Sequence, residues 1–166
     1  MVTKNSSGTN IAVGSSNEVT QPLQPAFLAY LATTDSNVTG NGGTYTLGSG
    51  NALTEVTDQG SNFNTNGTFT APVTGVYMLT LCSAIINNSS ATSLVLSIIT
   101  SNRTYQSDND FSSVSGSIAD DLATFADMDS GDTATYTIVV DGEAGDTSDA
   151  IGSSNVRNAV SGVLIA

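Results

Sequence analysis

One stretch of the sequence, Asn62–Thr80, constrains the fold of this chain more than any other. Phe63 and Phe69 flank a first turn rich in Asn and Gly, Pro72 and Gly75 bracket a second turn, and an apolar run follows. Gly, Pro and Asn favour turns, whereas aromatic and β-branched residues favour strands. The stretch therefore predicts a turn, a short strand, a corner and a longer strand.

The rest of the chain has the same β character. Gly, Ser, Thr and Asn are abundant among its 166 residues, and the long-chain residues that favour helices are scarce. Turn-separated strands are predicted at Ala26–Thr33, Thr44–Leu47, Leu53–Val56, Phe69–Ala71, Val76–Ile86, Ser93–Thr100, Val114–Phe125, Thr133–Val140 and Val156–Ile165, with turns at Asp35–Gly43 and Asn87–Ser90. We expect one all-β domain over residues 25–166, a jelly-roll sandwich of about ten antiparallel strands.

The first 24 residues differ from this domain. They are polar and rich in Gly, Ser, Thr and Asn, with one short apolar patch at Ile11–Val13, and they end between Pro22 and Pro25. Such a stretch buries too little surface to fold alone. It is either an unstructured tail or an extended N-terminal arm that lies on a partner, and we favour the arm.

Two predicted strands are apolar on both faces. In Val76–Ile85, Val76, Met78, Cys82 and Ala84 alternate with Tyr77, Leu79, Leu81 and Ile85, and Ser93–Thr100 shows a similar pattern. An antiparallel strand with one face in water alternates apolar and polar residues. Because the chain has no helix to cover a second apolar face, another copy of the chain is the simplest cover. The pattern predicts an oligomer.

The stretch Asn62–Thr80 resembles the central motif of the globular head of complement component one-q and of the wider tumour-necrosis-factor-like jelly rolls. The matching residues are Phe63-Asn64, then Gly67-Thr68-Phe69-Thr70-Ala71-Pro72 and Gly75-Val76-Tyr77, flanked by Pro25-Ala26-Phe27, Asp129-Ser130-Gly131-Asp132 and Ser161-Gly162-Val163-Leu164. The resemblance spans residues 25–166. It implies a ten-strand jelly roll that forms a compact homotrimer, with the Gly-x-Tyr strand near the threefold axis.

This resemblance makes Phe27, Tyr77, Leu79 and Leu81 candidates for the trimer interface. The chain lacks the collagen-like stalk, the tryptophan and the secretory signal of that family. We therefore do not extend complement or immune activity to it. We expect a protein made in a host cytoplasm.

The residue types needed for common catalytic sites are missing. There is no histidine, so a Ser–His–Asp triad is excluded, and no phosphate-binding Gly-rich loop with Lys occurs. Cys82 is the only cysteine and lies in an apolar strand, which predicts a small buried side chain. We expect neither an enzyme nor a cofactor.

The formal net charge of −12 argues against binding to nucleic acid or to an anionic membrane. It favours solubility, while attraction to a basic partner or to divalent cations stays open. Asp127, Asp129 and Asp132 are weak calcium candidates, and two further acidic clusters lie around Asp108–Asp110 and Asp141–Asp149. Asp and Gly are also ordinary turn residues, so solvated turns are favoured over a metal site.

These observations favour a structural virion protein. We expect a trimeric decoration or cement protein at the surface of a viral (phage) capsid, bound to the major capsid protein or another virion protein through its arm. The candidate arm contacts are Lys4, Ile11, Val13 and Val19. The alternative is a receptor- or glycan-binding module, a fibre tip or surface adhesin, that uses loops around Asp35–Gly43 and Asp141–Asn155. A third possibility is a secreted or surface trimer of a bacterium.

Overall fold

The computed structural model describes residues 3–5, 8–13, 15–16 and 18–166, which form strands, turns and loops. Its fourteen strands are β1 (Thr3–Asn5), β2 (Gly8–Val13), β3 (Val19–Thr20), β4 (Ala26–Tyr30), β5 (Asp35–Thr39), β6 (Thr44–Thr46), β7 (Thr54–Gln59), β8 (Phe63–Asn64), β9 (Thr68–Thr70), β10 (Gly75–Thr100), β11 (Thr104–Met128), β12 (Thr133–Asp141), β13 (Ser148–Ala150) and β14 (Ala159–Leu164). No helix able to cross a membrane occurs among the described residues.

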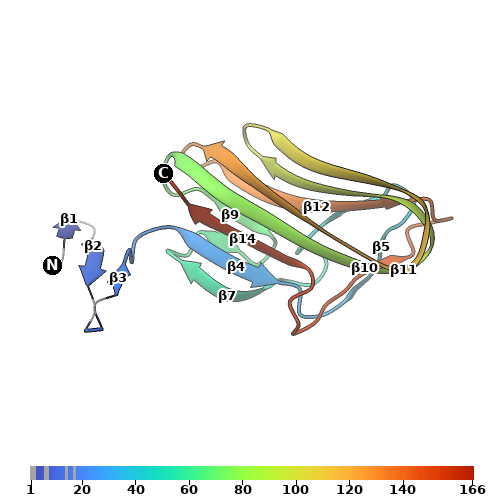
Figure 1. Ribbon diagram of the computed structural model, residues 1–166, viewed down its shortest axis with the longest axis horizontal. Coiled ribbons are helices and arrows are strands. Elements are labelled where there is room, and N and C mark those ends of the chain that lie inside the picture. The colour runs from blue at the N-terminus through green and yellow to red at the C-terminus, as the bar shows by residue number, and fades with distance from the viewer. Residues whose placement is uncertain (1–2, 6–7, 14, 17) are drawn as a thin grey trace.

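Eleven of these strands form one hydrogen-bonded sheet that folds over into two layers (Figure 1). In the first layer, β7, β4, β14, the first half of β10 and the second half of β11 lie side by side. In the second layer, β12 pairs with the second half of β10 and with β6 and β9, and the first half of β11 forms the edge. This all-β arrangement is the predicted jelly roll.

The longest strands connect the two layers. β10 and β11 form one antiparallel hairpin whose register shifts between Ile85 and Ser93, where both strands bend from the first layer into the second. Asn87, predicted to begin a turn between two separate strands, adopts a left-handed φ of 62° within the bend. The expected turn at Asn87–Ser90 is therefore a crossing between layers, because each half of β10 pairs with a different part of β11.

A single hydrophobic core fills the space between the layers. Alternate residues point inward, as the period of two in a strand requires. The largest fully buried side chains include Leu79, Leu81 and Ile85 in the first half of β10, Leu94, Leu96 and Ile98 in its second half, and Tyr136 in β12.

One predicted turn region contains a strand. The stretch Asp35–Gly43 was expected to be turn alone, but its first five residues form β5, which pairs with β13. β13 in turn pairs with β10 at Ile85 and Ile86. Polar residues form these short strands because β13 pairs with β10 and in turn supplies backbone partners to β5, a tertiary effect that local composition does not encode.

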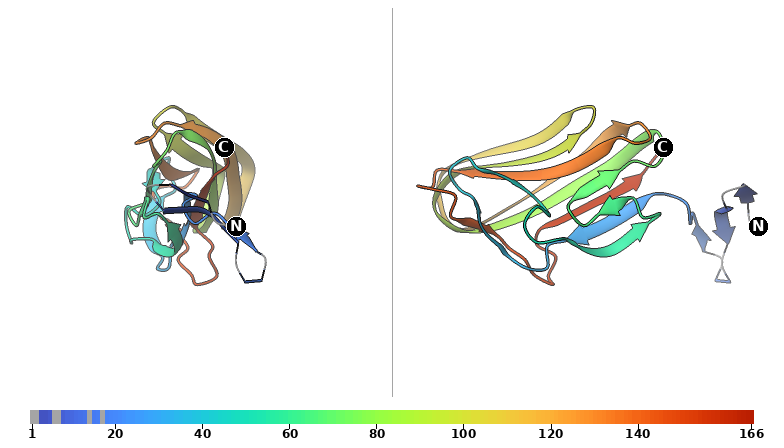
Figure 2. Two further views of the ribbon diagram at one scale, coloured as in Figure 1. Left: turned by 90° about the vertical axis from the view of Figure 1, so that its left-hand side faces the viewer. Right: turned by 180° about the vertical axis from the view of Figure 1, so that it is seen from behind.

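The N-terminal segment forms a separate sheet in the order β1-β2-β3. Figure 1 shows this sheet at one end of the molecule, beyond the start of β4, and Figure 2 shows the bend of β10 and β11 at the opposite end. The segment is thus not a continuous extended arm but a small antiparallel meander, since Ser15 and Ser16 form a turn before β3. We keep the name arm for residues 1–24.

Candidate functional site

The aromatic residues of the central motif form part of the core of one chain. The ring of Phe27 stacks on those of Phe63 and Phe69, with centroid distances of 4.7 and 4.8 Å, and Phe69 meets Tyr77 edge-on at 5.4 Å. The Tyr77 hydroxyl donates to the Val73 carbonyl at 2.7 Å. The motif therefore joins the second turn, β4 and the start of β10 by packing within the chain.

This packing corrects the prediction of which side chains contact a second copy of the chain. Phe27 is only 3% exposed, and Tyr77, Leu79 and Leu81 are fully buried. All four point between the two layers, so they are not available to a second copy. The sequence identified β10 as apolar on two faces, but the face open to a partner is the opposite one.

We define the outer face of the first layer as the side of β4, β14, β10 and β11 that points away from the core. One row of cross-strand partners on this face runs from Phe125 through Met78 and Val163 to Ala26. Phe125 is 65% exposed and Met78 is 36% exposed. Val76 and Ile165, near the same end, are also exposed. An exposed group of large apolar side chains on a sheet is typical of an interaction surface.

The outer face becomes more polar away from this row. Thr80 and Ser161 share a hydrogen bond of 2.7 Å between their hydroxyls. Cys82 lies in the next row, opposite Asp121. Burial and a hydrogen bond with Asp121 raise the pKa of the Cys82 thiol to about 11, which keeps it protonated at neutral pH. Cys82 was expected to be buried, but it is half-buried on the outer face because it shares the side of β10 with Met78 and Thr80.

The arm carries a second group of exposed apolar side chains. Val13 in β2 pairs with Val19 in β3, so both side chains lie on one side of the small sheet, and Ile11, two residues before Val13, lies on the same side. All three are exposed, Val19 by 66%. Lys4 lies in β1. These are the residues predicted to contact a partner.

The three weak calcium candidates each bind another group of the protein, in their own turn or in a neighbouring one. Asp127 forms an ion pair with Arg103 at 2.7 Å, and Asp132 accepts a hydrogen bond from the Asp129 N–H at 2.8 Å. Asp129 accepts one from the Thr74 hydroxyl at 3.3 Å. In the described part of the chain, no three His, Cys, Asp or Glu side chains are grouped to hold a metal ion.

Two acidic residues after β12 accept hydrogen bonds that hold the bent end of the molecule together. Glu143, a buried side chain, accepts hydrogen bonds from the Ser89 and Ser90 N–H groups at 2.6 and 2.7 Å and from the Ser89 hydroxyl at 2.6 Å. These bonds lower the pKa of Glu143. Asp149 accepts bonds from the Asn37 N–H at 2.8 Å and the Asn87 amide at 2.6 Å. These two carboxylates thus stabilise the bent end by accepting hydrogen bonds.

The two loop regions predicted for receptor binding meet at this bent end. The Asn41 and Gly43 N–H groups donate to the Asp146 carboxylate at 2.9 and 3.2 Å, which joins the two loops beyond the β5–β13 pair. Buried Asp35 accepts from the Tyr45 hydroxyl and from the Asn51 N–H, and burial raises the pKa of Tyr45. The loops form one fastened surface at the end opposite the arm (Figure 2).

Comparisons with known proteins show which solved structures this fold resembles. No protein-family model and no curated protein matches the sequence. Among solved structures, the chain is similar to the globular domain of zebrafish complement 1qA (19% identity, TM-score 0.55, 86% of this chain and 98% of that one). Murine APRIL is similar as well (13% identity, TM-score 0.58, 86% and 99%). So is the PRD1 vertex protein P5 (15% identity, TM-score 0.59, 98% and 86%). The chain has the jelly-roll fold that its central motif predicts.

Sequence reasoning missed Phe125, the most exposed aromatic residue of the outer face. Phe125 ended a predicted strand, but Asp121 and Ala123, the residues before it on the same side of β11, gave that side a polar or small character. Only the pairing of Phe125 with Met78 shows that the two belong to one surface. The signal present in the sequence was the second apolar side of β10.

Proposed function

We propose that this protein is a structural virion protein, a homotrimeric decoration or cement protein that binds a capsid through its arm. The observation that carries the proposal is the location of the exposed apolar side chains. Two groups of them lie at separate places, the outer face of the first layer and the arm, while Val56, Val73, Ile99 and Val156 are exposed elsewhere. The outer face supports contact between copies, and the arm supports contact with a different protein.

The outer face fits a contact between copies for three reasons. Its central row joins Phe125, Met78 and Val163 across three strands. The surface is contributed by regular strands, which offer a rigid shape to a partner. The family that the motif resembles packs its subunits around the strand equivalent to the first half of β10. Burial of these side chains between three copies would remove this exposed apolar area from water.

The arm fits attachment to a particle. It contains one basic and one acidic residue, Lys4 and Glu18, so the net charge of the protein resides in the jelly roll. A segment of zero net charge with exposed Ile11, Val13 and Val19 suits an apolar groove on a shell protein. The likeness to the PRD1 vertex protein covers 98% of the chain and so extends into the arm, whereas the likenesses to complement 1qA and APRIL cover 86%.

Three weak contacts can hold a trimer firmly. Once one arm is bound, the other two bind intramolecularly at a high effective concentration. A trimer on a threefold position of a shell therefore needs only modest affinity in each arm.

The test of this proposal uses particles that lack the protein because its gene has been deleted. Purified full-length protein is added back, beside a variant without residues 1–22. We expect full-length protein to sediment with the particles and the truncated variant to stay in solution. Native mass measurement should give three copies for both. Full occupancy by the truncated variant, or a stable monomer of the full-length protein, would overturn the proposal.

A second function, recognition of a receptor or glycan, is favoured by the fastened loops at the bent end. Asp146 and Asp149 hold these loops at the end opposite the arm, where they would face outward on a particle. Binding loops on a rigid scaffold are common. Retention of the truncated variant on envelopes of host cells, with no retention on bare capsids, would support this function over the first.

A further inference from the structure

The arm joins the jelly roll through a short turn, Gln21–Gln24. The Gln24 N–H donates to the Gln21 carbonyl at 3.0 Å and closes this turn. Pro22, inside it, has a restricted φ and removes one backbone donor. β3 ends at Thr20 and β4 begins at Ala26, so this turn, at the end of the arm, connects the small N-terminal sheet to the jelly roll.

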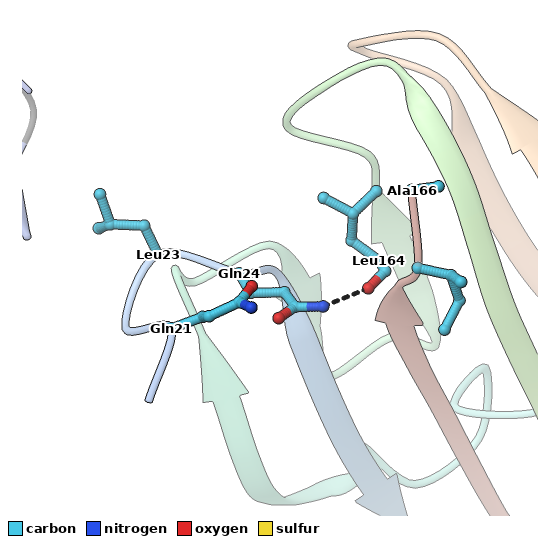
Figure 3. Close-up of a pocket in the computed structure, with 6 residues that line it drawn as sticks. Gln21, Leu23, Gln24, Leu164 and Ala166 are labelled. Atoms are coloured by element: carbon cyan, nitrogen blue, oxygen red, sulfur yellow. Dashed lines mark hydrogen bonds between the residues drawn. The ribbon is translucent and has the colours of Figure 1, made fainter. Parts of the chain in front are cut away.

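Two glutamine side chains hold the turn against the jelly roll. The amide of Gln59, the last residue of β7, donates to the Gln21 carbonyl at 2.8 Å and to the Gln24 carbonyl at 2.7 Å. The amide of Gln24 donates to the Leu164 carbonyl at 2.5 Å, as Figure 3 shows. Both amides therefore bind main-chain carbonyls, and together they tie the turn to β7 and β14.

Little apolar packing supports these bonds. A groove of about 260 Å³ lies on one side of Gln24, beside Leu164 and Ala166. A second groove of about 270 Å³ lies beside Ala26, Gln59 and Val163. Leu23, at the tip of the turn, is exposed and points away from the jelly roll (Figure 3). Hydrogen bonds thus hold the turn more than buried apolar area does.

We propose that Gln24 and Gln59 are positioning residues that lock the direction in which the arm leaves the domain. A Gly/Ser linker at this place would let the arm sample many directions. The locked turn instead fixes one direction, and fixing a binding segment beforehand lowers the entropy lost on binding. The importance of this lock for attachment rests on the proposed function.

The lock lies beside the outer face of the first layer. Ala26 and Val163 line one of the two grooves and are also neighbours in the row that contains Met78 and Phe125. In a trimer built on that face, three locked arms would leave the same end of the assembly in symmetric directions. They would present their apolar sides to one surface together.

Amide hydrogen exchange of the purified protein tests the lock without any particle. The variants are Gln59→Ala and Gln24→Ala. Gln21→Ala is the matched control, because the Gln21 side chain makes no hydrogen bond to a described residue while its carbonyl is retained. We expect the residue-24 amide to exchange roughly tenfold faster in the first two variants, since each loses one or two neutral hydrogen bonds. Amides of β10 and the control should match the wild type.

Equal exchange in Gln59→Ala, Gln24→Ala and the wild type would overturn the lock, as would equally faster exchange in Gln21→Ala. Particle binding is then measured for the same variants, and a roughly tenfold weaker attachment of Gln59→Ala is expected. Faster exchange with unchanged attachment would overturn the use of the lock in attachment. Failure of the wild type itself to bind particles would overturn the proposed function and leave the exchange result standing.

Discussion

The two layers of the jelly roll share one core but differ in their outer faces. On the first layer, a row of paired residues joins Phe125, Met78 and Val163. The corresponding surface of the second layer has Asp108 opposite Val95, and Gln106 opposite Ser97. Both surfaces lie on antiparallel strands of the same hairpin, β10 and β11. The difference in polarity between the two surfaces therefore comes from their side chains.

This difference shows which surface of the domain is suited to water. The polar side chains of Asp108 and Gln106 are exposed on the outside of the second layer, whereas the apolar side chains of Phe125 and Met78 are exposed on the first. Apolar area is costly to leave in contact with water, and a second copy of the chain is the cover that we propose. The predictions that follow test this contrast, beginning with the largest effect.

Introducing a charge on the outer face of the first layer should break the contact between copies. In Phe125→Asp, an unpaired carboxylate would be buried in the interface, at a cost of about 3–5 kcal/mol for each subunit. Native mass measurement should therefore change from three copies to one. Ile99→Asp is the matched control, because Ile99 is an exposed apolar residue on the outer face of the second layer. A trimer that persists in Phe125→Asp would contradict the assignment of this face.

Neighbouring residues of β10 should differ in their effect on the stability of one chain. Leu79→Ala removes a fully buried side chain and should lower the free energy of unfolding by about 2–5 kcal/mol. Met78→Ala, on the outer face, should lower it by less than about 1 kcal/mol. Urea unfolding measures both in the Phe125→Asp background, so that assembly does not contribute. Equal losses would show that the two faces of β10 are buried alike.

The bend that joins the two layers should weaken in acid. Hydrogen bonds to Ser89 and Ser90 lower the pKa of Glu143, so its ionised form stabilises the folded state above the ordinary pKa of a glutamic acid. This contribution is lost as the pH falls through the lowered pKa. The difference in Tm between the wild type and Glu143→Gln should be constant from pH 7 to about pH 5 and shrink below that. A difference that is independent of pH would contradict this role.

Salt should have the smallest effect on the assembly. If apolar contacts hold the copies together, raising NaCl from about 50 to 500 mM screens the repulsion between acidic subunits and lowers the dissociation constant roughly threefold. Sedimentation at a series of concentrations measures this. Weaker assembly at high salt would indicate an interface held by ion pairs.

The residues Phe63 to Tyr77 show how much of the fold can be predicted from local sequence. Their turns, the short strand β9 and the start of β10 follow from the positions of Gly, Pro and aromatic residues, and the structure confirms them. The jelly-roll class was also predictable, because strand periodicity and the central motif agree. The missed strand β5 was not, since its polar residues form a strand only through their pairing with β13.

The candidate surfaces were predictable in part. The exposed apolar residues of the arm, Ile11, Val13 and Val19, were identified from composition alone, because the surrounding residues are polar. Gln24 and Gln59 gave no signal, since each lies in an ordinary polar context and their partners are distant in the sequence.

By itself, the sequence determined that β10 is apolar on both sides, because alternation along a strand is a property of the chain. It did not determine which side is the core. Tyr77 and Met78 are both large and apolar, and either could point inward if the register of the sheet shifted by one residue. The tertiary structure decided it by pairing β10 with β14 and β11 and by stacking Phe27, Phe63 and Phe69 beside Tyr77. Those contacts put Tyr77 in the core, and they leave Met78 and Phe125 on the outside, where a partner can bind.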